Sequence, residues 1–273
     1  MGKRKLPARL RRACNTLLLG ILVCIIGVFS ARLVARSADT PYIEPFETPG
    51  AGAQGVETPG VETETEARAY TVVVDAGHGG ADGGAVGSKT GVVEAGLNLT
   101  VACGVRDALE EAGVAVLMTR TDENALADTK QADMQARRTI MNTEGVDLVV
   151  SVHMNRFTDP AVSGPMAFYM KGSEAGQHLA ELVIASVCEA IGRPVRSANP
   201  GDYFVIRESP APSVLVECGF LSNAEDEALL QTEEHQQKLV RGIVDGVLAF
   251  LAVTSGSGAS ARDGTALSES GES

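Results

Sequence analysis

Four ionisable residues stand in settings that side-chain packing alone does not explain. His78 lies in a stretch rich in glycine, Glu94 follows it, and His153 and Glu217 each end an apolar run. A buried charge destabilises a fold unless it is paired or bound to a metal. Two histidines and a carboxylate from separate segments form the ligand set that zinc takes in hydrolases, which leaves the fourth coordination position to water.

The spacing of these residues suits a catalytic metal site better than a zinc finger. The intervals from His78 to Glu94 and from Glu94 to His153 are 16 and 59 residues, whereas structural zinc sites pair their ligands a few residues apart. Zinc lowers the pKa of a bound water to about 7 and polarises a substrate carbonyl. A second carboxylate must then carry a proton from the water to a leaving amine. We therefore interpret His78, Glu94 and His153 as metal ligands and Glu217 as the catalytic residue.

The glycine-rich stretch around His78 has two other interpretations when it is taken alone. A dinucleotide fingerprint would need glycine at position 82, where Asp82 stands, and no phosphate-loop Gly-Lys-Ser/Thr follows. Nucleotide binding is therefore disfavoured. A purely structural glycine turn with an incidental histidine stays open on this stretch alone.

A cysteine hydrolase is an alternative from another chemical class. Cys218 is adjacent to Glu217 and would act as the nucleophile, with His153 as its base. This interpretation is disfavoured because it leaves His78 and Glu94 without a role.

The segments that must position these residues alternate between strand and helix patterns. The β-branched run at residues 72–74 suits a strand buried on both faces, and it leads into the glycine-rich stretch. Open α/β sheets keep their sites at such strand ends. The pattern predicts a single α/β domain with a twisted, mainly parallel sheet flanked by helices on both faces. The other expected strands are residues 114–119, 148–152, 166–170 and 214–216, and the expected helices are residues 98–112, 134–142, 176–191 and 233–251.

Composition divides the chain into four parts. Residues 1–36 hold eight Lys/Arg and no acidic residue around a 13-residue apolar core, which is typical of a basic flank and an export signal. Residues 37–69 are rich in Pro, Gly, Thr and Glu and predict a disordered linker. Residues 70–252 have the size of one catalytic domain. The Ser/Gly-rich residues 253–273 predict a disordered tail.

The N-terminal segment is predicted to stay as a signal anchor, because small residues are missing where cleavage requires them. We therefore expect an extracytoplasmic domain tethered to the cytoplasmic membrane, with cleavage and secretion as the alternative. Beyond this segment the chain has 15 Lys/Arg against 35 Asp/Glu. Such an acidic surface disfavours nucleic acid as a partner.

The five cysteines do not form a disulfide or metal framework. No pair has close metal-knuckle or redox spacing, so we expect Cys103, Cys188 and Cys218 to be small buried residues. An exported chain could oxidise Cys103 and Cys188 to a disulfide, which the sequence leaves open.

Several motifs occur together and in order along residues 71–251. They are Asp-Ala-Gly-His-Gly-Gly around His78, Glu94, Thr-Arg-Thr-Asp at residues 119–122, the segment 137–142, Ser-Val-His-Met-Asn around His153 and Val-Leu-Val-Glu-Cys-Gly-Phe around Glu217. Together they resemble the zinc-dependent N-acetylmuramoyl-L-alanine amidases of bacterial cell walls. The resemblance implies the family's twisted sheet with flanking helices, its Zn²⁺ ligands at His78, Glu94 and His153, and its catalytic glutamate at Glu217.

The resemblance also implies a reaction and a setting. The reaction is hydrolysis of the amide bond between N-acetylmuramic acid and L-alanine in peptidoglycan, in cell-wall remodelling, with sporulation and the spore cortex as one setting. The short stretch between His153 and Pro165 predicts that the long regulatory helix of some division-associated relatives is absent, and an activating protein partner stays open. The main alternative is a non-catalytic peptidoglycan-binding or activator domain. Such a domain usually lacks a ligand or the acid, and here none of the four residues is missing.

Overall fold

The structure is a computed structural model that describes residues 70–263, with side chains to residue 254. The predicted anchor at residues 1–36 and the predicted linker at residues 37–69 lie outside the described residues, as do residues 264–273. Within residues 70–263, no helix combines the length and the apolar character needed to cross a membrane.

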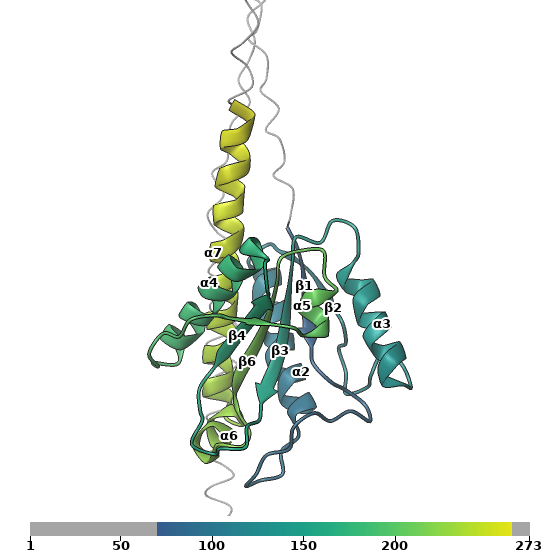
Figure 1. The fold of residues 1–273 in the computed structure, drawn as a ribbon, viewed down its shortest axis with the longest axis vertical. Helices are drawn as coiled ribbons and strands as arrows, with labels where there is room; N and C mark the ends of the chain where they lie inside the picture. The colour runs from purple at the N-terminus through teal and green to yellow at the C-terminus, as the bar shows by residue number, and fades with distance from the viewer. Residues whose placement is uncertain (1–69, 264–273) are drawn as a thin grey trace, which may run out of the picture. The chain divides into compact units, whose positions relative to one another are not determined.

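One six-stranded sheet forms the centre of the domain (Figure 1). Its strands are β1 (Thr71–Ala76), β2 (Ala115–Met118), β3 (Leu148–Asn155), β4 (Met166–Met170), β5 (Asn199–Gly201) and β6 (Ser213–Phe220). Their order across the sheet is β2-β1-β3-β6-β4-β5. All neighbours run parallel except β4 and β6, which are antiparallel. The predicted α/β fold with a mainly parallel sheet is confirmed.

Helices cover both faces of this sheet. They are α2 (Glu94–Glu111), α3 (Lys130–Met141), α4 (Glu174–Ala190), α5 (Phe204–Arg207), α6 (Ala224–Leu230) and α7 (Glu233–Asp263). Helices α2, α4 and α7 enclose the larger hydrophobic core, and α3 and α5 contribute to a smaller core on the other face. The central strands can be apolar at almost every position because both faces are buried.

The elements that carry Glu94, His153 and Glu217 extend beyond their predicted bounds. Strand β3 continues to Asn155 and β6 to Phe220, so His153 and Glu217 lie within strands and pair in register. Backbone hydrogen bonding does not depend on side-chain polarity, so the ladder continues past the apolar residues. Helix α2 begins at Glu94, whose negative charge is favourable at a helix N-terminus.

The C-terminal helix also differs from its prediction. Helix α7 continues to Asp263, so the predicted disordered tail at residues 253–273 is helical in its first part. Residues 253–263 contain no proline, and each residue added to an established helix gains a backbone hydrogen bond. Three short elements, β5, α5 and α6, have no counterpart among the predicted segments.

Candidate active site

The four ionisable residues lie near the C-terminal ends of the central parallel strands. His78 is in the loop that follows β1, and Glu94 opens α2. His153 and Glu217 face each other across neighbouring positions of β3 and β6. The fold therefore brings together residues that are separated by up to 139 positions in the sequence.

His78, Glu94 and His153 converge on one point. Their donor atoms lie within 4.8 Å of one another. Glu94 Oε1 is 3.3 Å from His78 Nε2 and 3.0 Å from His153 Nδ1. The two imidazole rings lie edge to face, with centroids 5.1 Å apart. Two nitrogen atoms and a carboxylate oxygen that approach one point from different directions can hold a single small cation.

Glu94 is held rigidly in this position. It is 3% exposed, and its Oε2 accepts a hydrogen bond from the Ala85 amide at 2.7 Å. Its Oε1 accepts from the Asn98 side chain at 3.1 Å and from the Met154 amide at 3.2 Å. Burial raises the pKa of Glu94, but hydrogen bonds to the two histidines lower it below its ordinary value. Glu94 is therefore ionised, as a metal ligand must be.

Asp82 orients His78 from its other side. His78 Nδ1 lies 3.0 Å from Asp82 Oδ1, and Lys130 Nζ lies 3.0 Å from Asp82 Oδ2. A carboxylate on one imidazole nitrogen fixes the tautomer and the ring orientation, so that the other nitrogen is presented to a metal. Asp82, which stands where a dinucleotide fingerprint would need glycine, thus positions His78.

Glycine is needed at two positions around these side chains. A Cβ at Gly77 would lie 2.2 Å from His153 Cε1, and a Cβ at Gly84 would lie 2.4 Å from Glu94 Oε2. Gly84 also has a φ of 71°, which glycine adopts without strain. The glycine-rich sequence therefore permits the close approach of imidazole and carboxylate groups.

A buried arginine fixes the backbone of His78. His78 has a φ of 62°, which is uncommon for a residue other than glycine. Arg137 donates to the carbonyls of His78 at 2.5 Å and Ala76 at 2.8 Å. The same guanidinium pairs with Asp75 at 2.6 Å and with Asp133 at 2.8 Å. These charge-assisted hydrogen bonds tie the loop to β1 and α3.

Thr119 and Arg120, which follow directly after β2, contact the C-terminal end of β1. The Thr119 hydroxyl donates to Asp75 at 2.8 Å. Arg120 donates to the carbonyls of Ala76 and Gly77, both at 2.9 Å. The sequence places these two residues in a motif but assigns them no role. Their contacts show that they position the loop of His78.

Replacement of Arg137 is expected to lower the urea concentration at which the domain unfolds. Arg137→Met leaves Asp75 and Asp133 buried without their partner, so we expect the free energy of unfolding to fall by about 3–5 kcal/mol. Urea denaturation of the chain measures this change.

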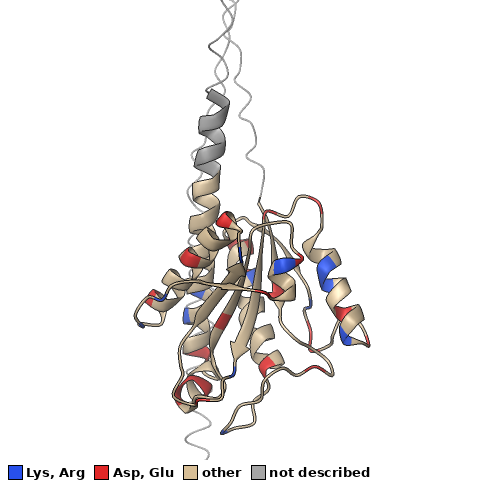
Figure 2. Ribbon diagram, viewed as in Figure 1, with Lys and Arg blue, Asp and Glu red and all other residues tan. Residues whose placement is uncertain are grey.

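Arg138, the next residue on α3, provides the control. This helix carries both basic and acidic residues (Figure 2). The Arg138 side chain is 48% exposed, and its ion pair with Glu208 is 3.5 Å long. Arg138→Met should change the free energy of unfolding by no more than about 0.5 kcal/mol. Equal losses in the two variants would contradict a special role for Arg137.

Glu217 stands in a different environment from Glu94. It is 9% exposed, and its Oε2 has no hydrogen-bond partner among the described residues. Burial raises the pKa of Glu217 to about 7, an effect that His153 opposes and that the charge of Glu94 reinforces. A carboxylate with a pKa near neutrality can both accept and return a proton. The environment thus separates the two carboxylates into an ionised one and one suited to proton transfer.

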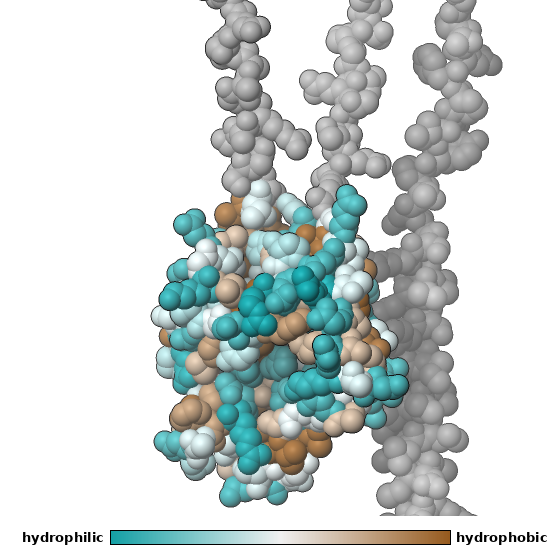
Figure 3. All heavy atoms as spheres, turned by 45° about the vertical axis from the view of Figure 1, so that its right-hand side comes forward, coloured by the Kyte–Doolittle hydropathy of each residue, from teal (hydrophilic) through white to brown (hydrophobic). Residues whose placement is uncertain are grey.

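A cleft of about 160 Å³ adjoins the two histidines of this set. His78 and His153 line it, together with Tyr203, which is 39% exposed. Burial and the charge of Glu217 raise the pKa of the Tyr203 hydroxyl. The face seen in Figure 3 mixes hydrophilic and hydrophobic residues around a hollow. Such a surface suits a ligand that carries both polar and apolar groups.

The cysteine-hydrolase alternative is not supported. Cys218 is 2% exposed and belongs to the larger core. Burial, followed by the charge of Glu217, raises the pKa of its thiol, whereas a nucleophilic cysteine needs a lowered pKa. Cys188 and Cys218 are buried as expected, whereas Cys103 is only partly buried. All three are free thiols in the structure, so no disulfide joins Cys103 to Cys188.

A protein-family model matches most of the described residues. The family model described as N-acetylmuramoyl-L-alanine amidase matches residues 72–249. The uncharacterised protein YqiI of Bacillus subtilis is 35% identical over 182 residues, which are 66% of this chain and 84% of that protein. The germination-specific N-acetylmuramoyl-L-alanine amidase of the same species is 31% identical over 188 residues, which are 66% of this chain and 78% of that protein.

A solved structure shows the same architecture. It is the CwlD amidase from Clostridioides difficile, determined in complex with the GerS lipoprotein, and it is 29% identical with a TM-score of 0.64. The match covers 67% of this chain and 99% of that one. The chain therefore shares nearly the whole fold of this amidase.

Proposed function

The chain belongs to the N-acetylmuramoyl-L-alanine amidase family, and we propose that it hydrolyses the bond between N-acetylmuramic acid and L-alanine with a zinc ion held by His78, Glu94 and His153. The family assignment makes the chain a peptidoglycan amidase. The observation that carries the zinc site is the convergence of these three residues within 4.8 Å. Because this set is complete and stands beside Glu217, a non-catalytic binding or activator domain is disfavoured.

The donor set fits zinc better than the other common divalent cations. Zn²⁺ readily binds two imidazole nitrogens and a carboxylate, whereas Ca²⁺ and Mg²⁺ prefer oxygen ligands throughout. Asp82 and the amide groups around Glu94 supply the outer contacts that orient metal ligands. When bound, zinc would supply Lewis-acid activation of the substrate carbonyl and of water.

The protein's own residues would position the substrate and transfer the proton. We assign Glu217 to take a proton from the attacking water and to give it to the alanine nitrogen as the amide C–N bond breaks. Burial of Glu217 raises its pKa above the ordinary value, which favours return of the proton after it has been accepted. The Arg137 network keeps His78 in place while the proton moves.

Mass spectrometry of digested peptidoglycan tests the choice of bond. Incubation with the zinc-loaded chain should release peptides that begin with a free L-alanine amino group and carry no muramic acid. Released peptides that keep the muramoyl group, or cleavage inside the peptide stem, would contradict the proposal.

We further propose cell-wall remodelling in the spore cortex or during germination as the setting. Support comes from the likeness to the germination-specific amidase and to the CwlD amidase. Since that CwlD structure includes the GerS lipoprotein, a protein activator is part of this proposal. A deletion strain with normal spores and germination but an altered vegetative wall would contradict this setting.

The basic and apolar pattern of residues 1–36 supports a signal anchor. We expect cell fractionation to find the intact chain in the membrane fraction, with the catalytic domain accessible from outside. A processed and freely soluble main species would contradict the anchor, although it would leave export intact.

A further inference from the structure

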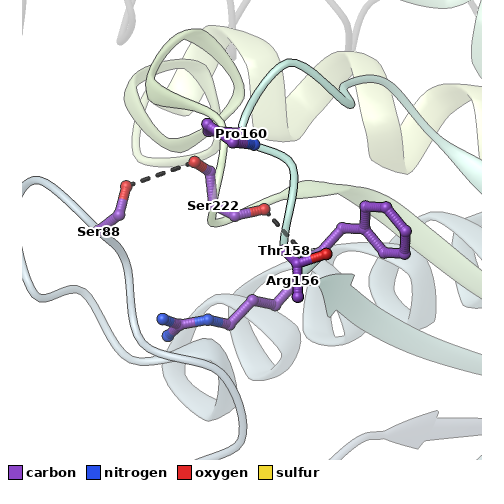
Figure 4. Close-up of a pocket in the computed structure, with 6 residues that line it drawn as sticks. Ser88, Arg156, Thr158, Pro160 and Ser222 are labelled. Atoms are coloured by element: carbon purple, nitrogen blue, oxygen red, sulfur yellow. Dashed lines mark hydrogen bonds between the residues drawn. The ribbon is translucent and has the colours of Figure 1, made fainter.

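A second hollow lies past the ends of β3 and β6. Its volume is about 550 Å³, and we call it the Arg156 groove (Figure 4). The residues that line it are Ser88, Arg156, Phe157, Thr158, Pro160 and Ser222. None of them takes part in the chemistry proposed above, and none is acidic.

Both walls of the Arg156 groove are held by hydrogen bonds. Residues 88–90 donate to the carboxylate of Glu227, which is 1% exposed on α6. On the other wall the Phe157 amide donates to Ser222 Oγ at 3.0 Å. The groove is therefore preformed, and a ligand would not have to order it.

Arg156 presents an available guanidinium to the groove. Its Nη1 donates to the Val86 carbonyl at 2.9 Å, and its side chain extends toward the loop that carries Ser88 (Figure 4). Its other guanidinium N–H groups have no partner among the described residues, and no described carboxylate forms an ion pair with it. A guanidinium that is held by one contact and keeps further N–H donors can form a bidentate pair with a carboxylate.

The charge of the surrounding domain makes this arginine selective. Residues 70–252 contain 13 Lys/Arg and 25 Asp/Glu, so most of the surface repels an anionic ligand. The groove lining has one cation and no acid. An acidic group on a ligand is therefore favoured here and disfavoured over most of the domain.

The groove is close to the proposed metal ligands along the chain. The Ala85 amide donates to Glu94 at 2.7 Å, and the carbonyl of the next residue, Val86, accepts from Arg156. The loop that holds Glu94 through Ala85 therefore also contacts Arg156 through Val86. A stem that runs along this loop from the cleaved bond would place its second residue about 7 Å from that bond, in the direction of Arg156.

We propose that the Arg156 groove binds the peptide stem of peptidoglycan, and that Arg156 recognises a carboxylate on the second residue of that stem. This inference rests on the proposed function, because it takes the cleaved amide to lie at His78, Glu94 and His153. Phe157 is 53% exposed and adds an apolar surface for the stem beside the charge.

The test compares two muramoyl dipeptides that differ in one group. The α-carboxyl group of the second residue is free in one and a carboxamide in the other. For the zinc-loaded chain we expect KM to be about 10-fold lower for the free carboxylate, since a charge-assisted pair is gained, with kcat similar for both. Arg156→Gln should raise KM for the carboxylate substrate alone and abolish the preference. Arg156→Lys should restore part of it.

Arg241→Gln is the matched control, because it removes one positive charge from the exposed surface of α7 and should keep the full preference. Equilibrium binding of both dipeptides to the zinc-loaded Glu217→Gln protein gives a readout that does not need turnover. A chain that hydrolyses neither dipeptide but binds the carboxylate form through Arg156 would contradict the proposed function and support the groove. Equal binding of both forms, or a preference that survives in Arg156→Gln, would overturn the inference.

Discussion

Glu217→Gln is expected to lower the rate of peptide release at least about 100-fold while zinc content stays unchanged. The substitution keeps the size of the side chain and removes its basicity. Glu217 is buried at a fixed strand position, and its Oε2 has no partner among the described residues, so loss of charge there should leave the neighbouring side chains in place. Elemental analysis and quantitative mass spectrometry of released peptides measure the two quantities on one preparation.

Glu94→Gln is the matched comparison. Its carboxylate oxygen lies within 3.3 Å of both histidine nitrogens, so the amide should weaken zinc binding itself and reduce turnover for that reason. If Glu217→Gln kept near-normal turnover, or lost zinc to the same extent as Glu94→Gln, the roles of the two carboxylates would be assigned wrongly.

Loss of either histidine is expected to have the second large effect. His78→Ala or His153→Ala leaves two ligands where three are needed, so each variant should retain no zinc after dialysis and show no amidase activity. Zinc content per chain is measured by elemental analysis, and circular dichroism checks that the fold is intact.

His178→Ala controls for the removal of an imidazole. His178 is an exposed residue of α4 whose ring packs against Phe250, away from the three ligands. This variant should keep full zinc occupancy and full activity. Full occupancy in His78→Ala and His153→Ala as well would disprove the metal site.

The chemistry-bearing residues could be found in the sequence because they interrupt apolar runs. His153 and Glu217 stand out against the valines of β3 and β6, and His78 stands out among glycines. Their juxtaposition follows from parallel strands that end at one edge of a sheet. The sequence therefore predicted the fold class and the candidate set together.

The role of Arg137 in holding the His78 loop could not be predicted from the sequence pattern. Arg137 is on a helix with charged neighbours, where a charge usually faces solvent, yet it is 2% exposed and meets Asp75 from 62 positions away. Burial of this kind depends on contacts between distant segments, and one sequence does not display them. Periodicity alone gives no sign that Arg137 is an interior residue.

The short elements escaped prediction for a local reason. Strand β5 contains Pro200, which argues against a strand except at a sheet edge, and β5 is an edge strand. Helix α6 is 7 residues long, with Asn223 as its N-cap, so its apolar period is too brief to recognise. Both elements are defined by their neighbours more than by their own sequences.

The backbone of His78 is fixed before any metal binds at the proposed site. Asp75, Asp133 and Arg137 hold the loop with contacts that contain no metal, unlike a zinc finger, which is unfolded without its ion. Uptake of zinc then needs only the loss of water and of protons from the ligands. The metal-free domain can therefore stay folded, and activity that depends on a metal at the proposed site would rise and fall reversibly with the free metal concentration, without refolding.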